Sequence, residues 1–134
     1  LLQGRSLGYV RLAFDTTKPE MSNVLAFLRV ATDPDKRPVF VHCKHGADRT
    51  GMMVAFYRIV VQGWSKKDAI REMRRGGFGF HPIWGHLIRF IKKADIPTLK
   101  RALQRDGGEA VGDEKKQEEM APSGEEITDT REAR

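Results

Sequence analysis

The stretch Val-Phe-Val-His-Cys-Lys-His-Gly-Ala-Asp-Arg-Thr-Gly, residues 39–51, decides how this chain folds. It opens with a β-branched run that ends in Cys43, and five residues separate this cysteine from Arg49. Thr50 and Gly51 then lead into a long apolar pattern of helical period. This order predicts a strand, a short loop and a helix N-terminus, with a thiol at one end of the loop and a guanidinium at the other.

Such a loop is suited to holding a tetrahedral dianion against a sulfur nucleophile. Backbone N–H groups from Lys44 to Arg49 can point at one centre, and the helix N-terminus adds unpaired donors and the positive end of its dipole. Gly46 permits a turn that a side chain would obstruct. Arg49 can grip two phosphate oxygens at once. The same positive field lowers the pKa of Cys43 and favours its thiolate.

Residues 42–51 resemble the signature loop of the cysteine-dependent protein tyrosine and dual-specificity phosphatases, in particular the bacterial-type dual-specificity enzymes. The family pattern is His-Cys, five residues, Arg, Ser or Thr and usually Gly, with another Gly three positions after the Cys. Every element is present here. The resemblance covers roughly residues 8–95. It implies an α/β fold with a parallel sheet between helix layers, and the chain begins so close to Cys43 that we expect the amino-terminal strands to be missing.

The resemblance also implies a mechanism that needs no metal or cofactor. Cys43 would attack phosphorus and form a phosphocysteine, which water then hydrolyses while Thr50 eases the departure of the thiolate. Arg49 would hold the phosphate in the ground state and the transition state. The loop residues expected to bind the substrate phosphate are Lys44, His45, Gly46, Ala47, Asp48 and Arg49.

Two aspartates compete for the role of general acid, which must protonate the leaving oxygen. Asp15 lies 28 residues before Cys43, just after an expected strand end, where the family usually places its acid. Its alternative reading is a turn residue that caps the backbone. Asp48 stands immediately before Arg49, as in some bacterial tyrosine and lipid phosphatases. We favour Asp15 as the general acid. Asp48 would then orient Arg49 or cap the helix that follows the loop.

The histidines and the second half of the chain are less informative. The resemblance implies that His42 holds the loop by hydrogen bonds, whereas His81 and His86 read as structural or surface residues. The loop at residues 76–81, Gly-Gly-Phe-Gly-Phe-His, is expected to border the site. The cations of the segment 66–75 read most simply as a solvated helix face, with a substrate or membrane-surface patch as the alternative.

The expected elements alternate as an α/β protein requires. Strands are predicted at about 8–14 and 38–42, the second apolar throughout and buried on both faces. Thr17 to Glu20 reads as a capping box that starts the first helix. The predicted helices cover about 18–31, 49–62, 66–75, 82–93 and 97–105.

Composition sets the remaining bounds. The single cysteine suits a reducing compartment such as the cytoplasm. The sequence contains no apolar run of 18 residues, so we expect no integral membrane segment in it. Residues 1–105 carry 20 Lys and Arg against 8 Asp and Glu, whereas residues 106–134 carry 4 against 10. We therefore expect a catalytic domain at 1–105, amino-terminally truncated, and a disordered acidic tail at 106–134. The basic body favours anionic partners, but no nucleic-acid motif accompanies it.

The predicted function is hydrolysis of phosphomonoesters, above all of phosphotyrosine, phosphoserine and phosphothreonine proteins. Lys44 and His45 add positive charge, so an inositol-phosphate or phosphoinositide substrate is the alternative. A noncatalytic phosphate-binding module and a different thiol enzyme stay open as other classes, although an arsenate reductase normally needs a second thiol. The oligomeric state is not determined by the sequence.

Overall fold

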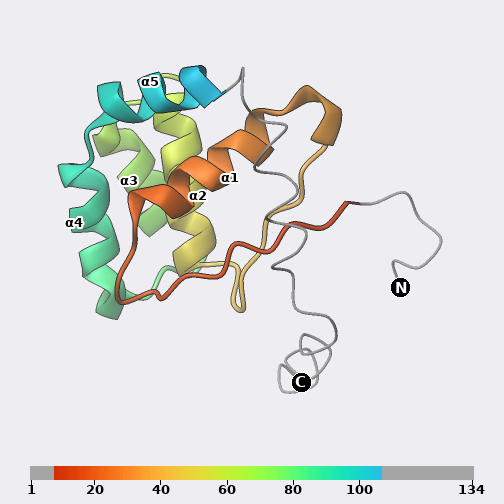
Figure 1. Cartoon of the computed structure of the whole chain (residues 1–134). Helices are drawn as coiled ribbons and strands as arrows, with labels where there is room; N and C mark the ends of the chain where they lie inside the picture. Colours follow the sequence, from red (N-terminus) through yellow and green to blue (C-terminus); the bar gives the residue numbers. More distant parts are fainter. Residues whose placement is uncertain (1–7, 107–134) are drawn as a thin grey trace.

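The computed structural model describes residues 8–106 (Figure 1). Five α-helices and two short 3-10 helices account for the regular structure of this part of the chain. Their bounds are α1 Met21–Thr32, η1 Pro34–Lys36, α2 Asp48–Val60, α3 Lys66–Arg75, η2 Pro82–Trp84, α4 Gly85–Lys93 and α5 Ile96–Asp106. The expected acidic tail lies outside the described residues, apart from the last residue of α5.

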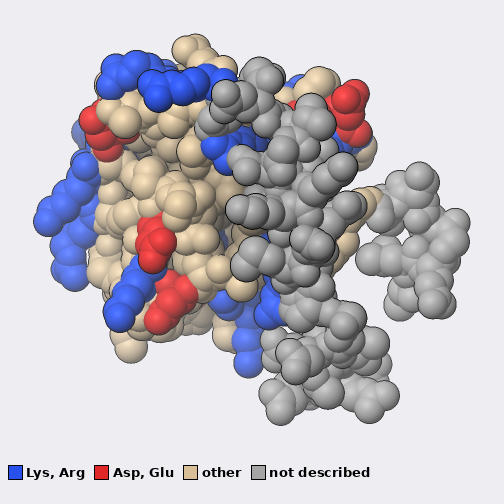
Figure 2. Space-filling view, in the orientation of Figure 1, with Lys and Arg blue, Asp and Glu red and all other residues tan. Residues whose placement is uncertain are grey.

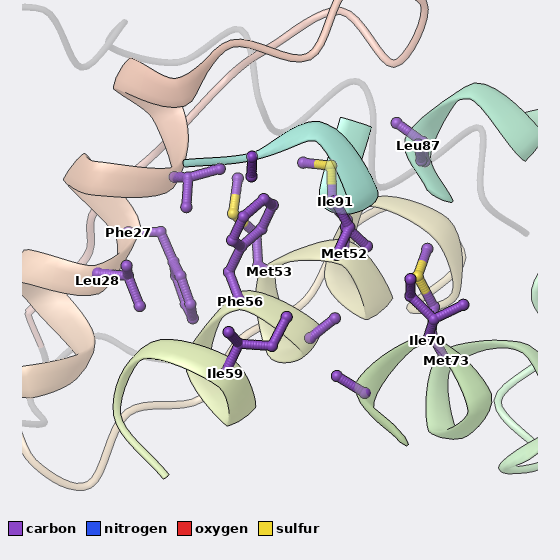
Figure 3. Packing of buried hydrophobic residues seen from close by; sticks show 14 of the residues in the cluster. Phe27, Leu28, Met52, Met53, Phe56, Ile59, Ile70, Met73, Leu87 and Ile91 are labelled. Carbon is purple, nitrogen blue, oxygen red and sulfur yellow. The ribbon is translucent and has the colours of Figure 1, made fainter. Parts of the chain in front are cut away.

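Helix α2 is the centre of the fold, because it packs against each of the other four α-helices. Its apolar residues recur on several faces, which is the pattern of a helix surrounded by protein. Met52 and Phe56 have no exposed surface and meet Leu28 of α1 and Ile91 of α4 in one hydrophobic cluster (Figure 3). This packing fixes the position of the α2 N-terminus, which immediately follows the Cys43 loop.

Helices α2 and α3 pack against each other more extensively than any other pair of helices in residues 8–106. The local sequence explains where α2 ends and where α3 begins. Gly63 adopts a φ of 72°, and the Trp64 N–H donates to the Arg58 carbonyl at 2.9 Å, so α2 ends in a glycine-based motif. The Ser65 hydroxyl accepts a bond from the Asp68 N–H and caps α3. Arg58 then binds Glu72 through two nitrogen atoms, at 2.8 and 3.0 Å. The predicted span of this helix, 66–75, is confirmed.

Other helix starts differ from the prediction for local reasons. Helix α1 begins at Met21 rather than near residue 18, and its N-cap Glu20 makes no side-chain cap bond. The predicted capping box is therefore wrong, because the hydroxyl of Thr17 donates to Asp15 instead. The segment 82–93 splits at Gly85 into η2 and α4. Asp95 caps α5 by accepting from the N–H and the hydroxyl of Thr98.

The two predicted strands are extended segments, but no residue between 8 and 106 is assigned to a β-strand. Residues 8–11 are all exposed, whereas side chains alternate between exposed and half-buried over 11–14 and 38–42. Leu12, Phe14 and Val41 pack against the helical core. Phe40, on the other face, is 87% exposed. The expectation that residues 38–42 are buried on both faces is therefore wrong for this chain, since its helices cover only one of them.

None of the helices in the described range is both long and apolar enough to cross a membrane.

Candidate active site

The loop from Cys43 to Ala47 joins the extended segment at 38–42 to the first turn of α2. Gly46 has a φ of 66°, a conformation that a residue with a side chain adopts only with strain, and open space surrounds the position of its missing Cβ. The need for Gly46 is thus conformational. The loop turns here so that the cysteine and the N-terminus of α2 belong to one short connection.

The half-buried thiol of Cys43 lies among hydrogen-bond donors. Burial by itself raises the pKa of this thiol. The hydroxyl of Thr50 and the backbone N–H groups of Thr50, His45 and Gly46 outweigh that effect, so the pKa of Cys43 lies below its ordinary value. Each of these donors stabilises the thiolate more than the thiol. The loop therefore provides a cradle of N–H groups around the sulfur.

Thr50 is the side chain most closely tied to this sulfur. Its Oγ1 is buried and makes no well-aligned hydrogen bond to another group among residues 8–106, yet it lies near enough to favour the thiolate. A buried hydroxyl without a partner is costly, so the Cys43 sulfur is the acceptor that its position serves. This arrangement brings together two of the predicted site residues.

Arg49 occupies the first turn of α2 and is half-buried. Its guanidinium forms no hydrogen bond or ion pair with residues 8–106, so its five N–H donors are not engaged by any side chain or carbonyl of this part of the chain. Lys44, His45 and Gly46 are exposed around the loop, whereas Ala47 is buried at the helix N-cap. Exposed cations beside a helix N-terminus can attract and hold an anion.

Asp48 has a different setting, since it is 93% buried and both of its carboxylate oxygens are engaged. Oδ1 accepts from the backbone N–H of His81 at 2.8 Å, and Oδ2 lies 2.8 Å from the ring Nδ1 of the same residue. A carboxylate only accepts, so Nδ1 carries the proton in this pair. Asp48 therefore connects the Cys43 loop to the loop at 76–81, which is confirmed as a neighbour of the site.

Asp15 lies in an exposed turn before α1 and is engaged with its own neighbours. Its Oδ1 accepts from the N–H and the hydroxyl of Thr17, each at 2.8 Å. These two bonds lower the pKa of Asp15, which holds it as a carboxylate in this arrangement. The ring Nε2 of His86, 2.6 Å from the Thr16 carbonyl oxygen, ties the same turn to α4.

The histidines divide differently from the prediction. His42 is exposed, contacts the Phe40 ring at a centroid distance of 5.7 Å and makes no hydrogen bond to the described residues. The hydrogen bonds by which His42 was expected to hold the Cys43 loop are therefore absent within residues 8–106. His81 instead holds the loop through Asp48, and its ring lies 6.0 Å from that of His45. Sequence reasoning missed this role, although the glycines before His81 were a signal that the segment folds back on itself.

No group of three or more His, Cys, Asp or Glu side chains within residues 8–106 has the arrangement of a metal site.

A thiol favoured as thiolate, placed between an extended segment and a helix N-terminus, defines the class of cysteine-based phosphate sites. Comparison with known proteins makes the assignment specific. The sequence profile of the DSP-PTPase phosphatases fused to NAD+ kinase matches residues 4–85. Because this match spans more than half of the chain, the chain belongs to the DSP-PTPase phosphatase family.

Individual relatives agree with this assignment. The chain is 40% identical over 95 residues to the dual specificity protein phosphatase TpbA of Pseudomonas aeruginosa strain UCBPP-PA14, an alignment that covers 70% of this chain and 44% of TpbA. It is 35% identical over 81 residues to the inositol diphosphatase DSP5 of Arabidopsis thaliana, covering 60% of this chain and 38% of DSP5. The chain thus spans less than half the length of these curated relatives.

Solved structures show the same likeness in three dimensions. The crystal structure of P. aeruginosa TpbA superposes with a TM-score of 0.67 at 36% identity, covering 77% of this chain and 65% of that one. A cysteine-to-serine variant of TpbA in complex with phosphotyrosine superposes equally well, at 35% identity. The phosphatase fold predicted from the Cys43 loop is thereby confirmed at the level of the family.

Proposed function

We propose that this protein is a metal-independent phosphatase that hydrolyses phosphotyrosine and phosphoserine or phosphothreonine esters through a phosphocysteine at Cys43. The observation that carries the proposal is the thiol itself, whose pKa is lowered by Thr50 and by the loop N–H groups. A thiolate is a nucleophile at neutral pH, and the same N–H groups suit an incoming phosphoryl group.

The first step transfers phosphorus from the ester oxygen to sulfur. The Cys43 thiolate attacks phosphorus, the bond to the ester oxygen breaks, and the departing oxygen takes a proton from a general acid. Arg49, whose donors are free of partners within residues 8–106, holds the nonbridging oxygens together with the N–H groups of residues 44–49. Water then attacks the phosphocysteine, and the Thr50 hydroxyl stabilises the thiolate as it leaves.

We assign the general acid to Asp15 rather than to Asp48. Asp48 is supported less as an acid, since it is buried and both of its oxygens are held by His81. Asp15 is exposed and bound only within its own turn, so a bound substrate can recruit it. Its pKa must then rise on binding, as a phosphate dianion nearby would make it do.

The sheet and the domain limits are part of the same proposal. We assign the extended segments at 8–14 and 38–42 to neighbouring strands of a parallel sheet, in a catalytic domain that spans 1–105. The alternating exposure of residues 11–14 and 38–42 supports this assignment. A reducing compartment such as the cytoplasm would preserve the single thiol.

An inositol-phosphate substrate is the second candidate. It is favoured by the cationic rim of the loop, where Lys44 and His45 are exposed and the His81 ring lies close by. The relative DSP5 bears the name inositol diphosphatase.

A panel assay of the full chain in the presence of a chelator tests the proposal. Phosphotyrosine and phosphothreonine peptides and an inositol polyphosphate are compared, with Cys43→Ser as the matched variant. We expect phosphate release from the peptides in chelator and its loss in Cys43→Ser. Preference for the inositol polyphosphate would support the second candidate. Phosphopeptide binding without turnover would leave a phosphate-binding module, and a requirement for divalent metal would contradict the mechanism.

A further inference from the structure

A groove between α3 and α4 carries an unusual concentration of positive charge. Its volume is roughly 330 Å³, and six of its seven lining residues are Lys or Arg. The lining residues are Lys66, Lys67, Ile70, Arg71, Arg74, Arg75 and Lys92. Figure 2 shows Lys and Arg atoms along the left edge of the molecule, over α4, with acidic atoms beside them at the upper end of this edge.

Internal contacts account for only two of these six cations. Lys66 donates to the carbonyl oxygens of Lys92 and Ala94, at 2.8 and 2.7 Å, and so caps the end of α4. Arg71 pairs with Asp68 at 3.1 Å. The other four, Lys67, Arg74, Arg75 and Lys92, have no acidic partner within residues 8–106.

These four side chains are exposed, so solvent screens much of their mutual repulsion, and the α3 dipole offsets about half a charge at the helix C-terminus. Their concentration in one groove makes that groove suited to an anionic occupant.

The groove extends toward the Cys43 loop. A second hollow shares Arg74 and Arg75 with the first and continues to Phe80 and Pro82. These two residues flank His81, which is bound to Asp48 in the first turn of α2 and lies beside the His45 ring. The residues thus form a continuous path from the phosphate-binding loop to the cationic groove.

We propose that this groove binds an acidic segment of the phosphoprotein substrate, several residues along the chain from the phosphorylated side chain. The inference rests on the proposed phosphatase function and specifies its substrate class. An extended peptide advances about 3.3 Å per residue, so residues four to eight positions from the phosphorylated side chain lie roughly 13–26 Å from it, and we place the acidic segment in this range. Arg74 and Arg75 would supply bidentate donors for the carboxylates of the peptide. The aliphatic parts of its acidic side chains would contact Ile70, Phe80 and Ile88.

Equilibrium binding to the Cys43→Ser variant of the whole 134-residue chain tests the proposal without depending on turnover. The probes are fluorescent phosphotyrosine peptides with neutral flanks, with three Glu residues four to eight positions before the phosphotyrosine, or with the same residues after it. We expect the peptide whose Glu residues reach the groove, on one side of the phosphotyrosine, to bind about tenfold more tightly than the neutral peptide. That is about 1.4 kcal/mol shared by three exposed ion pairs. The advantage must shrink as salt is raised to 0.5 M, at a Debye length of about 4 Å.

Two double variants locate the effect. Arg74→Gln with Arg75→Gln removes two groove charges and is expected to abolish the tenfold advantage while binding of the neutral peptide is retained. Lys100→Gln with Arg105→Gln makes the same charge change on exposed residues of α5, which packs against α1 and α2. This control is expected to keep the advantage, and circular dichroism of both variants confirms that they fold.

Several outcomes would overturn the inference while leaving the proposed function intact. Equal binding of acidic and neutral phosphopeptides would do so, as would an equal loss in the α5 control, which would indicate only the overall charge. A synthetic peptide of residues 107–134 can be compared with unlabelled acidic phosphopeptide as a competitor of the fluorescent acidic phosphopeptide. If the 107–134 peptide competes at lower concentration, the groove belongs to the chain's own tail. Failure of the neutral phosphopeptide to bind at all would instead contradict the phosphatase proposal itself.

Discussion

At the scale of single residues, the site depends on how the Cys43 sulfur is surrounded. Burial opposes ionisation, and four hydrogen-bond donors from three residues reverse that effect. Thr50 contributes two of the four, its hydroxyl and its backbone N–H. The side chain of Thr50 therefore favours the resting thiolate, and we expect it to stabilise in the same way the thiolate that leaves in the second step.

Thr50→Ala removes the hydroxyl and keeps the backbone N–H. We expect the pKa of Cys43 to rise toward that of an ordinary thiol, and hydrolysis of the phosphocysteine to slow by about tenfold or more. The phosphorylated protein then accumulates during turnover and is detected by mass spectrometry after an acid quench. Thr50→Ser, which keeps the hydroxyl, is the control. If Thr50→Ala accumulates no more phosphorylated protein than the unaltered chain, this residue has no role in the second step.

Asp15→Asn tests the assignment of the general acid. An amide cannot give up a proton, so we expect turnover of alkyl phosphates such as phosphothreonine peptides to fall by about 100-fold or more. Nitrophenyl phosphate has a good leaving group and is expected to lose less than about tenfold. The ratio of the two kcat values is the measurement. Equal losses on both substrates would show that Asp15 only supports its turn.

At the scale of elements, the decisive contact joins the loop at 76–81 to the start of α2. His81 uses both its backbone N–H and its ring to bind Asp48, so two segments of the chain reinforce one carboxylate. Charge-assisted bonds to a buried group are among the stronger contacts in proteins. Asp48 thus ties the loop at 76–81 to the first turn of α2, where Arg49 follows it, and we propose that it positions this turn.

Asp48→Asn weakens this contact without changing the size of the side chain. We expect kcat/KM to fall by about tenfold on alkyl and aryl phosphates alike, with a higher KM, because the loss of about 1.4 kcal/mol affects phosphate binding in both cases. His81→Asn is expected to reproduce part of the effect. A loss confined to alkyl phosphates would contradict this and identify Asp48 as the acid.

Helices were largely predictable from the sequence, because their signals are local. Ser65 and Gly63 mark the ends of α3 and α2 through a cap and a positive φ, which depend on neighbouring residues alone. Thr17 failed as a cap because Asp15 competes for its hydroxyl, a choice that the residue pattern does not decide. The strands were harder, since a strand needs a partner and only one face of residues 38–42 is covered.

At the scale of the whole molecule, stability comes from the cluster around α2. Phe56 has no exposed surface and lies among residues of α1, α2 and α4 (Figure 3). Its ring also makes an edge-to-face contact with Phe90 at a centroid distance of 5.8 Å. Phe40 carries the same side chain but is 87% exposed. The two phenylalanines make a matched pair for measuring where the fold derives its stability.

Phe56→Ala is expected to lower the free energy of unfolding by about 3–5 kcal/mol, because it leaves a cavity in the core. Phe40→Ala is expected to change it by less than about 0.5 kcal/mol, as exposed substitutions usually do. Urea denaturation followed by circular dichroism gives both values. A large loss in Phe40→Ala would show that its open face is covered in solution.

The candidate site was predictable where chemistry and chain neighbours coincide. Cys43, Gly46, Arg49 and Thr50 lie within eight residues, so their shared loop follows from the sequence. The contact between Asp48 and His81 spans 33 residues and depends on how α2, α3 and α4 pack. The groove between α3 and α4 has the same origin, since it pairs the cations of α3 with Lys92 of α4.

The most direct test of the central claim is the titration of Cys43 in the intact chain. As the chain has a single cysteine, the rate of alkylation by iodoacetamide at each pH reports this thiol alone. We expect a midpoint below that of a free cysteine, about 8.5, in the folded protein, and a return to about that value in urea. A folded-state midpoint at or above the urea value would contradict the thiolate cradle and the phosphatase mechanism built on it.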